Sequence, residues 1–101
     1  MRAVPVDDKM TVAIKKVGVI GSGQMGNGIA HVAALAGFDV ALNDVSGDRL
    51  KSALATINGN LTRQVAKKAI SETDRKQALD RITSAETIDA LADCDLVIET
   101  A

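Results

Sequence analysis

Three glycines in the run 21–26 have the spacing of a phosphate-binding turn. The run reads G-S-G-Q-M-G, follows an apolar segment and opens a segment with helical periodicity. Gly21 would permit a tight turn, Gly23 would let a phosphate approach the backbone, and Gly26 would let the helix pack closely on the strand. The first N–H groups of that helix would bind the phosphates. The spacing therefore predicts a dinucleotide-binding site.

An acidic residue, Asp44, follows the last of these glycines by 18 positions and ends a second apolar segment. A carboxylate at this place accepts hydrogen bonds from an adenosine ribose and repels a 2′-phosphate. Val45 and Ser46 come next, and Arg49 lies a turn into the following helix. This pattern favours NAD over NADP. Enzymes that bind FAD use a similar pattern, so these residues do not exclude a flavin as the cofactor.

Two strands and a helix must position these residues. Residues 16–21 and 39–43 are short apolar runs, which is typical of parallel strands buried on both faces. Between them, residues 24–36 carry apolar side chains at helical spacing, and Gly37 supplies a stop signal. The first 44 residues thus predict one strand–helix–strand unit of an α/β fold.

The second half of the chain predicts a long helix and two more strands. Apolar residues recur every three or four positions from Leu50 to Val65, after a suitable N-cap at Ser46. The further predicted elements are a helix with a capping box at 71–74, strands over 81–83 and 95–99, and a short helical turn over 85–92.

The connection between the second and third predicted strands is unusually long. It runs 38 residues from Asp44 to Ile82, whereas a crossover needs about a dozen. The surplus indicates a helical hairpin. Such a hairpin either projects from the sheet to reach a partner or a large substrate, or is a padded structural crossover.

Composition excludes several classes of function. Twelve Lys and Arg against 13 Asp and Glu give a net charge of −1, which offers no basic surface to nucleic acid or an anionic membrane. Phe38 is the one aromatic residue, which excludes a base-stacking platform. Cys94 is the one cysteine, which excludes an internal disulfide and a zinc site and fits a reducing cytosol. No apolar run approaches the roughly 20 residues that span a bilayer.

The two ends of the chain carry predictions about domain organisation. Residues 1–9, which include a proline and two aspartates, are expected to form a flexible tail that is neither a signal peptide nor a transit peptide. The apolar segment 95–99 would be a buried strand, and the sequence stops two residues later. We therefore expect residues 10–101 to be the N-terminal part of a longer nucleotide-binding domain.

The run KKVGVIGSGQMGNGIAHVAALAGFDVALNDVS resembles the N-terminus of the 3-hydroxyacyl-CoA dehydrogenases, particularly bacterial 3-hydroxybutyryl-CoA dehydrogenases. The resemblance continues through INGNLTRQVAKK to DLVIE and covers residues 10–101. It implies an NAD-dependent enzyme that transfers hydride between NAD(H) and a 3-hydroxyacyl-CoA or 3-oxoacyl-CoA, in fatty acid or butanoate metabolism. It also implies a Rossmann-like, doubly wound parallel sheet with its first four strands in the order 3-2-1-4 and a helical hairpin after strand 2.

The resemblance assigns roles to individual residues. The implied cofactor-binding residues are Gly21, Ser22, Gly23, Gln24, Met25, Gly26, Asp44, Thr100 and Ala101. A polar residue and a lysine that contact CoA in the family match Asn60 and Lys67, or Lys68 if the alignment is shifted by one residue. The family's catalytic serine, His–Glu pair and asparagine lie beyond residue 101, so no catalytic residue and no metal ligand is assigned. His31 is expected to be a surface or packing residue of the first helix.

The resemblance further implies an acyl-CoA substrate, a cytoplasmic protein, and a homodimer made by a helical C-terminal domain. It implies no nucleic acid or membrane partner. The 101 residues alone are expected to be inactive. Two alternatives stay open: another β-hydroxyacid or nucleotide-sugar dehydrogenase, and a stand-alone NAD-binding module without catalysis.

Overall fold

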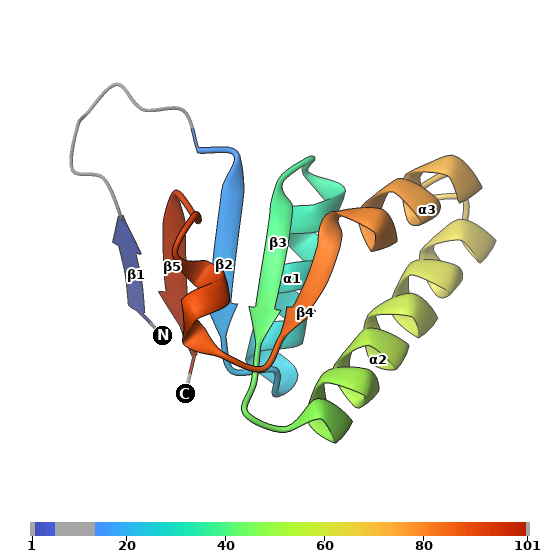
Figure 1. Cartoon of the computed structure of the whole chain (residues 1–101). Coiled ribbons are helices and arrows are strands. Elements are labelled where there is room, and N and C mark those ends of the chain that lie inside the picture. The colour runs from blue at the N-terminus through green and yellow to red at the C-terminus, as the bar shows by residue number, and fades with distance from the viewer. Residues whose placement is uncertain (1, 6–13, 101) are drawn as a thin grey trace.

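A computed structural model describes residues 2–5 and 14–100, in which five strands form one sheet in the order β1-β5-β2-β3-β4 (Figure 1). The strands are β1 Arg2–Pro5, β2 Lys16–Ile20, β3 Asp39–Asn43, β4 Ile82–Ala85 and β5 Leu96–Glu99. Strands β2 to β5 are parallel to one another, and β1 is antiparallel to β5. The predicted strands one to four are β2, β3, β4 and β5, so the predicted order 3-2-1-4 is confirmed.

Helices connect the parallel strands at the predicted places. They are α1 Gln24–Leu35, α2 Gly47–Ala66, α3 Glu72–Arg81 and the short 3₁₀ helix η1 Ile88–Leu91. The hydroxyl of Ser46 accepts a hydrogen bond from the Arg49 N–H at 3.3 Å and caps α2. Ser71 and Asp74 form a capping box at the start of α3. Both predicted caps are confirmed.

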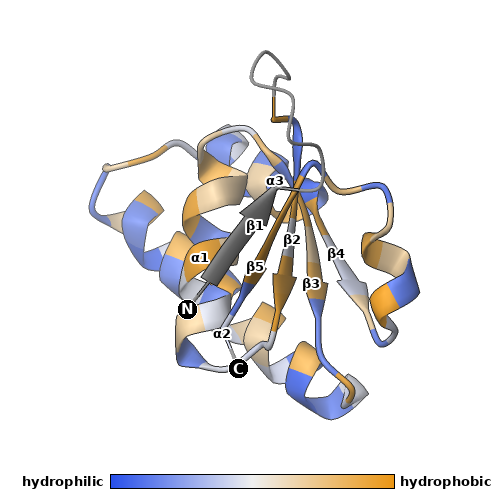
Figure 2. Ribbon diagram, turned by 90° about the vertical axis from the view of Figure 1, so that its left-hand side faces the viewer, coloured by the Kyte–Doolittle hydropathy of each residue, from blue (hydrophilic) through white to orange (hydrophobic). Residues whose placement is uncertain are grey.

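The main core lies between one face of the sheet and the three α-helices. Figure 2 shows β2, β3 and β5 as mostly hydrophobic strands, as expected for strands with side chains buried on both faces. The buried side chains of this core are Val17, Val19, Ala30, Ala34, Val40, Leu42, Leu50, Ala53, Ile57, Leu61 and Ala78. The α1 members are alanines, which let the helix approach the sheet closely.

The α2–α3 hairpin packs on the core as well as presenting an exposed outer surface. The buried residues of the hairpin belong to the main core and are Leu50, Ala53, Ile57, Leu61 and Ala78. The Nε2 atom of His31 on α1 lies 2.7 Å from Oε1 of Gln64 on α2. Arg81, the last residue of α3, donates from Nη1 to the carbonyl oxygen of Ala34 at 2.8 Å. The hairpin is therefore tied to α1 at both of its helices.

The opposite face of the sheet is covered by η1 and the turn that follows it. There Ala41, Leu91 and Cys94 form a smaller buried cluster. Burial raises the pKa of the Cys94 thiol, and the residue is 3% exposed. A thiol in that environment is a core side chain and a poor nucleophile.

Strand β1 lies within the segment that was expected to be a flexible tail. Residues Arg2–Pro5 pair with Glu99 to Leu96 of β5, whereas residues 6–9 of the expected tail lie outside the described residues. The physical reason for the pairing is the free edge of β5, whose N–H and C=O groups need partners. A proline at the end of an edge strand is compatible with this pairing.

Candidate cofactor site

A hollow of about 380 Å³ lies at the carboxyl ends of β2, β3 and β5. Its lining residues are Ile20, Gly21, Ser22, Gly23, Gln24, Met25, Gly26, Asn43, Asp44, Val45, Arg49 and Thr100. The hollow lies at the point where the strand order reverses, between β2 and β5, which is the place where ligands bind in open α/β sheets. Eight of the nine predicted cofactor residues line it. The ninth, Ala101, lies outside the described residues.

The glycine loop leads directly from β2 into α1. Gly21 has a φ of 97°, in the left-handed region that favours glycine, and its N–H donates to the carbonyl oxygen of Asn43 at 2.8 Å. A Cβ atom on Gly26 would collide with the carbonyl oxygen of Gly21. A Cβ atom on Gly23 would meet no atom within 4 Å. The backbone at Gly23 is thus open to a ligand.

The first turn of α1 presents a positive end to the hollow. The N-cap residue, Gly23, makes no side-chain hydrogen bond to the N–H groups of this turn, and the turn contains no acidic residue. The first N–H groups of a helix have no partners within the helix, and the helix dipole is positive there. A pyrophosphate would supply both the acceptors and the negative charge. The residues present therefore fit a dinucleotide.

Asp44 is held in one orientation by three hydrogen bonds. Its Oδ2 accepts from the N–H of Ser22 at 3.1 Å and from the hydroxyl of Ser22 at 2.8 Å. Its Oδ1 accepts from the N–H of Ser46 at 3.1 Å. The hydrogen bond from the Ser22 hydroxyl, with those from the backbone, holds the pKa of Asp44 below its usual value. The hollow therefore has a charged carboxylate in its wall at neutral pH.

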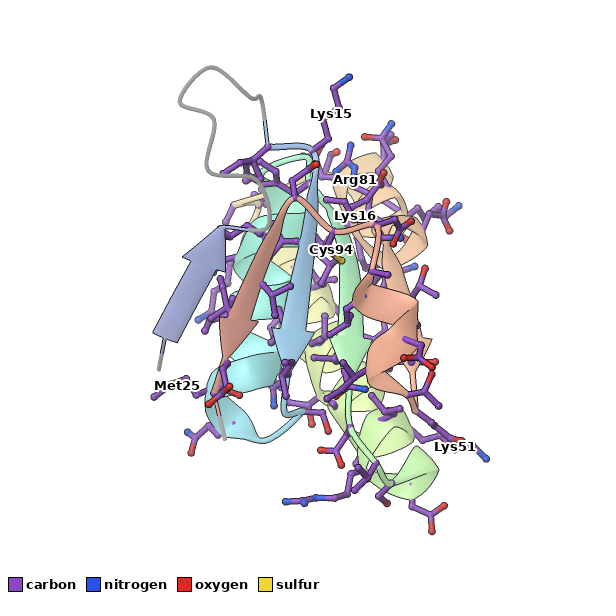
Figure 3. The ribbon with its side chains drawn as sticks, turned by 60° about the vertical axis from the view of Figure 1, so that its left-hand side comes forward. Lys15, Lys16, Met25, Lys51, Arg81 and Cys94 are labelled. Atoms are coloured by element: carbon purple, nitrogen blue, oxygen red, sulfur yellow. The ribbon has the colours of Figure 1, made fainter. Side chains whose placement is uncertain are left out.

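Thr100 and Met25 bound the hollow near β5 and α1. The hydroxyl of Thr100 donates to the carbonyl oxygen of Ile20 at 2.7 Å, which ties the residue after β5 to the end of β2. Met25 is 55% exposed, and Figure 3 shows its side chain pointing outward beside the start of α1. An exposed, flexible thioether suits contact with a flat ring.

The sequence matches known proteins over most of its length. Residues 16–101 match the family described as 3-hydroxyacyl-CoA dehydrogenase, NAD binding domain. The chain belongs to this family. The match decides between NAD and FAD, which the residues alone had left open, in favour of NAD.

Relatives of the NAD-binding domain include dehydrogenases of 3-hydroxyacyl-CoA compounds. A 3-hydroxybutyryl-CoA dehydrogenase of Bradyrhizobium diazoefficiens is 74% identical over 92 residues, which are 91% of this chain and 31% of that protein. A 3-hydroxyadipyl-CoA dehydrogenase of Escherichia coli is 40% identical over 92 residues, 91% of this chain and 19% of that protein. The domain thus spans a third or less of these relatives.

Solved structures share the fold of the NAD-binding domain. A 3-hydroxybutyryl-CoA dehydrogenase from Escherichia coli matches with a TM-score of 0.87 at 40% identity, over 89% of this chain and 19% of that one. An (S)-3-hydroxybutyryl-CoA dehydrogenase from Ralstonia eutropha matches with a TM-score of 0.86 at 38% identity, over 88% of this chain and 31% of that one. The Rossmann-like fold is thereby confirmed.

The two residues expected to contact CoA lie on α2, outside the lining of the hollow. Asn60 is half-buried, and its Oδ1 accepts a hydrogen bond from the guanidinium of Arg63. Lys67 is exposed and forms the C-cap of the helix. The spacing of these three residues places them on one face of α2. Sequence reasoning missed Arg63, although its spacing from Asn60 was a usable signal.

Three further side chains make contacts that the sequence analysis did not specify. Arg49 lines the hollow although it lies a turn inside α2. The hydroxyl of Ser22 bonds to a carboxylate 22 positions away, and a serine within a glycine loop carries no sequence signal for that contact. His31 is absent from the lining of the hollow and contacts Gln64, in agreement with a packing role.

Proposed function

We propose that the NAD-binding domain holds NAD(H) in the hollow and, within a longer protein, serves hydride transfer between NAD(H) and a 3-hydroxyacyl-CoA or its 3-oxo form. The observation that carries the proposal is a hydrogen bond between the glycine loop and Asp44. The N–H of Ser22 donates to Oδ2 of Asp44 at 3.1 Å. One side of the hollow offers helix N–H groups to a pyrophosphate, and the other offers a carboxylate to a ribose. Relatives named 3-hydroxybutyryl-CoA dehydrogenase support 3-hydroxybutyryl-CoA as the substrate.

In this proposal, different residues of the hollow bind different parts of the cofactor. The backbone of residues 21–26 binds the pyrophosphate, and Gln24 and Met25 flank it from the first turn of α1. Asp44 accepts from the adenosine ribose. Thr100, at the end of β5, is proposed to lie beside the nicotinamide half, and Ala101, the next residue in the sequence, is proposed to bind the same half. The bound cofactor accepts or supplies the hydride, while these residues bind and orient it.

Titration with NADH tests the cofactor part of the proposal. The domain contains no Trp and no Tyr, so the fluorescence of NADH itself reports binding without a protein background. We expect a saturable signal with NADH and weaker binding of NADPH. A signal that does not saturate, or equal affinities for the two dinucleotides, would contradict the proposal.

The dehydrogenase part is tested on the protein as its native source makes it. Since the domain covers 31% of its relative in Bradyrhizobium, we expect an intact mass about three times the 10.5 kDa of this chain. That protein should oxidise NADH when acetoacetyl-CoA is added. A protein of that mass with no acetoacetyl-CoA-dependent oxidation would contradict the assigned reaction.

The exposed face of α2 is proposed to bind the CoA part of the substrate through Asn60 and Lys67. Arg63 on the same face adds a second positive charge, and cationic side chains pair well with phosphate groups. The amide of Asn60 is already oriented by Arg63. This face therefore combines charge with a positioned polar group.

Assembly and location belong to the same proposal. We expect a homodimer formed by a helical C-terminal domain, in the cytoplasm, without nucleic acid or membrane partners. Within residues 2–5 and 14–100, no helix is long and apolar enough to cross a membrane.

A second candidate function is a non-catalytic NAD-binding module. His31 contacts Gln64 and is absent from the lining of the hollow, so among the described residues the hollow has no histidine as an acid–base group. A native protein of about 10.5 kDa that binds NADH without reducing acetoacetyl-CoA would support this second function.

A further inference from the structure

The side chains of Ser22 and Asp44 form a nearly buried pair in the wall of the cofactor hollow. They are 5% and 7% exposed, and both line the hollow. In the described part of the chain, every buried side-chain nitrogen and oxygen has a hydrogen-bond partner. The pair can therefore accept hydrogen bonds from a ligand only with the lone pairs that its internal hydrogen bonds do not use.

The internal hydrogen bonds leave the pair with acceptor positions only. A carboxylate has about four acceptor positions, two on each oxygen. Oδ2 of Asp44 uses two of them, on the N–H and the hydroxyl of Ser22, and Oδ1 uses one, on the N–H of Ser46. The Ser22 hydroxyl has donated its one proton to Asp44 and keeps its lone pairs. One acceptor position thus remains on Oδ1, and the Ser22 oxygen supplies another.

We propose that Ser22 and Asp44 act together as a two-acceptor unit that selects an unmodified adenosine ribose. The ribose carries adjacent 2′ and 3′ hydroxyls, and each would donate to one member of the pair. A 2′-phosphate offers acceptor oxygens and negative charge to the same place, where it would meet two acceptors, one of them charged. Ser22 is then a positioning residue that also determines specificity. This inference rests on the proposed binding of NAD(H).

The electrostatics around the pair make the role of Ser22 measurable. The Ser22 hydroxyl is the largest cause that lowers the pKa of Asp44, and the charged side chain that acts on Asp44 through space is Arg49 on α2. A carboxylate that becomes protonated loses its acceptor strength, so affinity for the ribose falls as the pH falls through the pKa of Asp44. Loss of the Ser22 hydroxyl raises this pKa while Arg49 stays in place. The acid limit of binding would then move to higher pH.

Ser22→Ala tests the proposal, because it removes the hydroxyl and keeps the backbone N–H. NADH and NADPH are titrated by their own fluorescence at neutral pH. The oxidised forms, NAD and NADP, are stable in acid and are titrated by calorimetry over a series of lower pH values. We expect the Kd for NADH to rise about three- to tenfold, as the loss of one or two hydrogen bonds at a charged pair predicts. The Kd for NADPH should change less, so the preference for NADH narrows. The acid limit, which is the lowest pH at which NAD still binds, should move to a higher value.

Two further variants separate this role from a structural one. Ser22→Gly removes the same hydroxyl by a different substitution and should reproduce the result. Ser84→Ala removes an exposed hydroxyl on the edge strand β4 and should change neither Kd. Circular dichroism and thermal unfolding verify that each variant is folded.

The outcomes are distinct. Equal weakening of NADH and NADPH with an unmoved acid limit would show a distorted loop and overturn the proposal, as would unchanged affinity for NADH. If the unsubstituted domain itself fails to bind NADH, the proposed function is wrong, and this result is separate from any effect of Ser22.

Discussion

A Cβ atom on Gly26 would lie 1.8 Å from the carbonyl oxygen of Gly21 and 3.3 Å from the hydroxyl of Thr100. The first turn of α1 therefore touches the end of β2 at a point where no side chain fits. This contact brings the N–H groups of α1 over the hollow and next to the residue that follows β5. The distance between strand and helix at the site depends on the absence of a side chain at position 26.

Gly26→Ala should therefore destabilise the domain and abolish NADH binding. Overpacking at a close contact typically costs about 1–3 kcal/mol, and here the obstacle is backbone. Urea unfolding measures the free energy of unfolding. Gly28→Ala is the matched control in the same helix, because its Cβ would meet nothing within 4 Å, and it should stabilise the domain by up to about 1 kcal/mol. Equal stabilities for the two variants would refute the close contact.

Gly23→Val should abolish NADH binding while leaving the fold intact. The position has a φ of −66°, which valine adopts readily, and the space around an added Cβ is open. The new side chain would occupy the space that the pyrophosphate needs. Circular dichroism should be unchanged, thermal unfolding should shift only by the small loss that valine causes at a helix N-cap, and NADH titration should show no saturation. Retained affinity would mean that the phosphates bind elsewhere.

Asp44→Ala should narrow the ratio between the affinities for NADH and NADPH. The substitution removes an acceptor for the ribose and a negative charge that repels a 2′-phosphate. In the unsubstituted domain, hydrogen bonds lower the pKa of Asp44, so binding of NAD, which unlike NADH is stable in acid, should persist as the pH falls below the ordinary range of an aspartate and be lost only at lower pH. Parallel titrations at several pH values measure both effects. An unchanged ratio would remove Asp44 from the specificity site.

Lys67→Ala in the complete enzyme should raise the KM for acetoacetyl-CoA about fivefold and leave the KM for NADH unchanged, because an ion pair made by an exposed lysine contributes up to about 1 kcal/mol. Lys51→Ala is the control, because Lys51 is exposed near the start of the same helix, where Figure 3 shows its side chain pointing outward. Its spacing from Lys67 places the two lysines on nearly opposite sides of the helix. Steady-state kinetics with each substrate varied in turn separates the two constants. Comparable effects of both lysines, or equal effects on both KM values, would argue against a CoA site at Lys67.

The parallel strands and the helices could be predicted because each is encoded by residues close together in the chain. The apolar run before Gly21, the periodic stripe of α2 and the caps at Ser46 and Ser71 are local patterns, and the structure confirms all of them. Strand β1 could not be predicted in this way. Its residues show no strand pattern of their own, and their pairing depends on the free edge of a strand more than 90 positions away.

The sequence by itself determined the α/β class and the glycine loop with Asp44, because steric and hydrophobic patterning over a few residues is sufficient to specify each of them. The strand order was implied by the family resemblance and not by local patterning. The tertiary structure decided which atoms meet. Only packing brings the Ser22 hydroxyl to Asp44, His31 to Gln64 and Thr100 to the end of β2. These contacts join residues 22, 33 and 80 positions apart, and hydrogen bonds over such separations are set by the arrangement of whole elements.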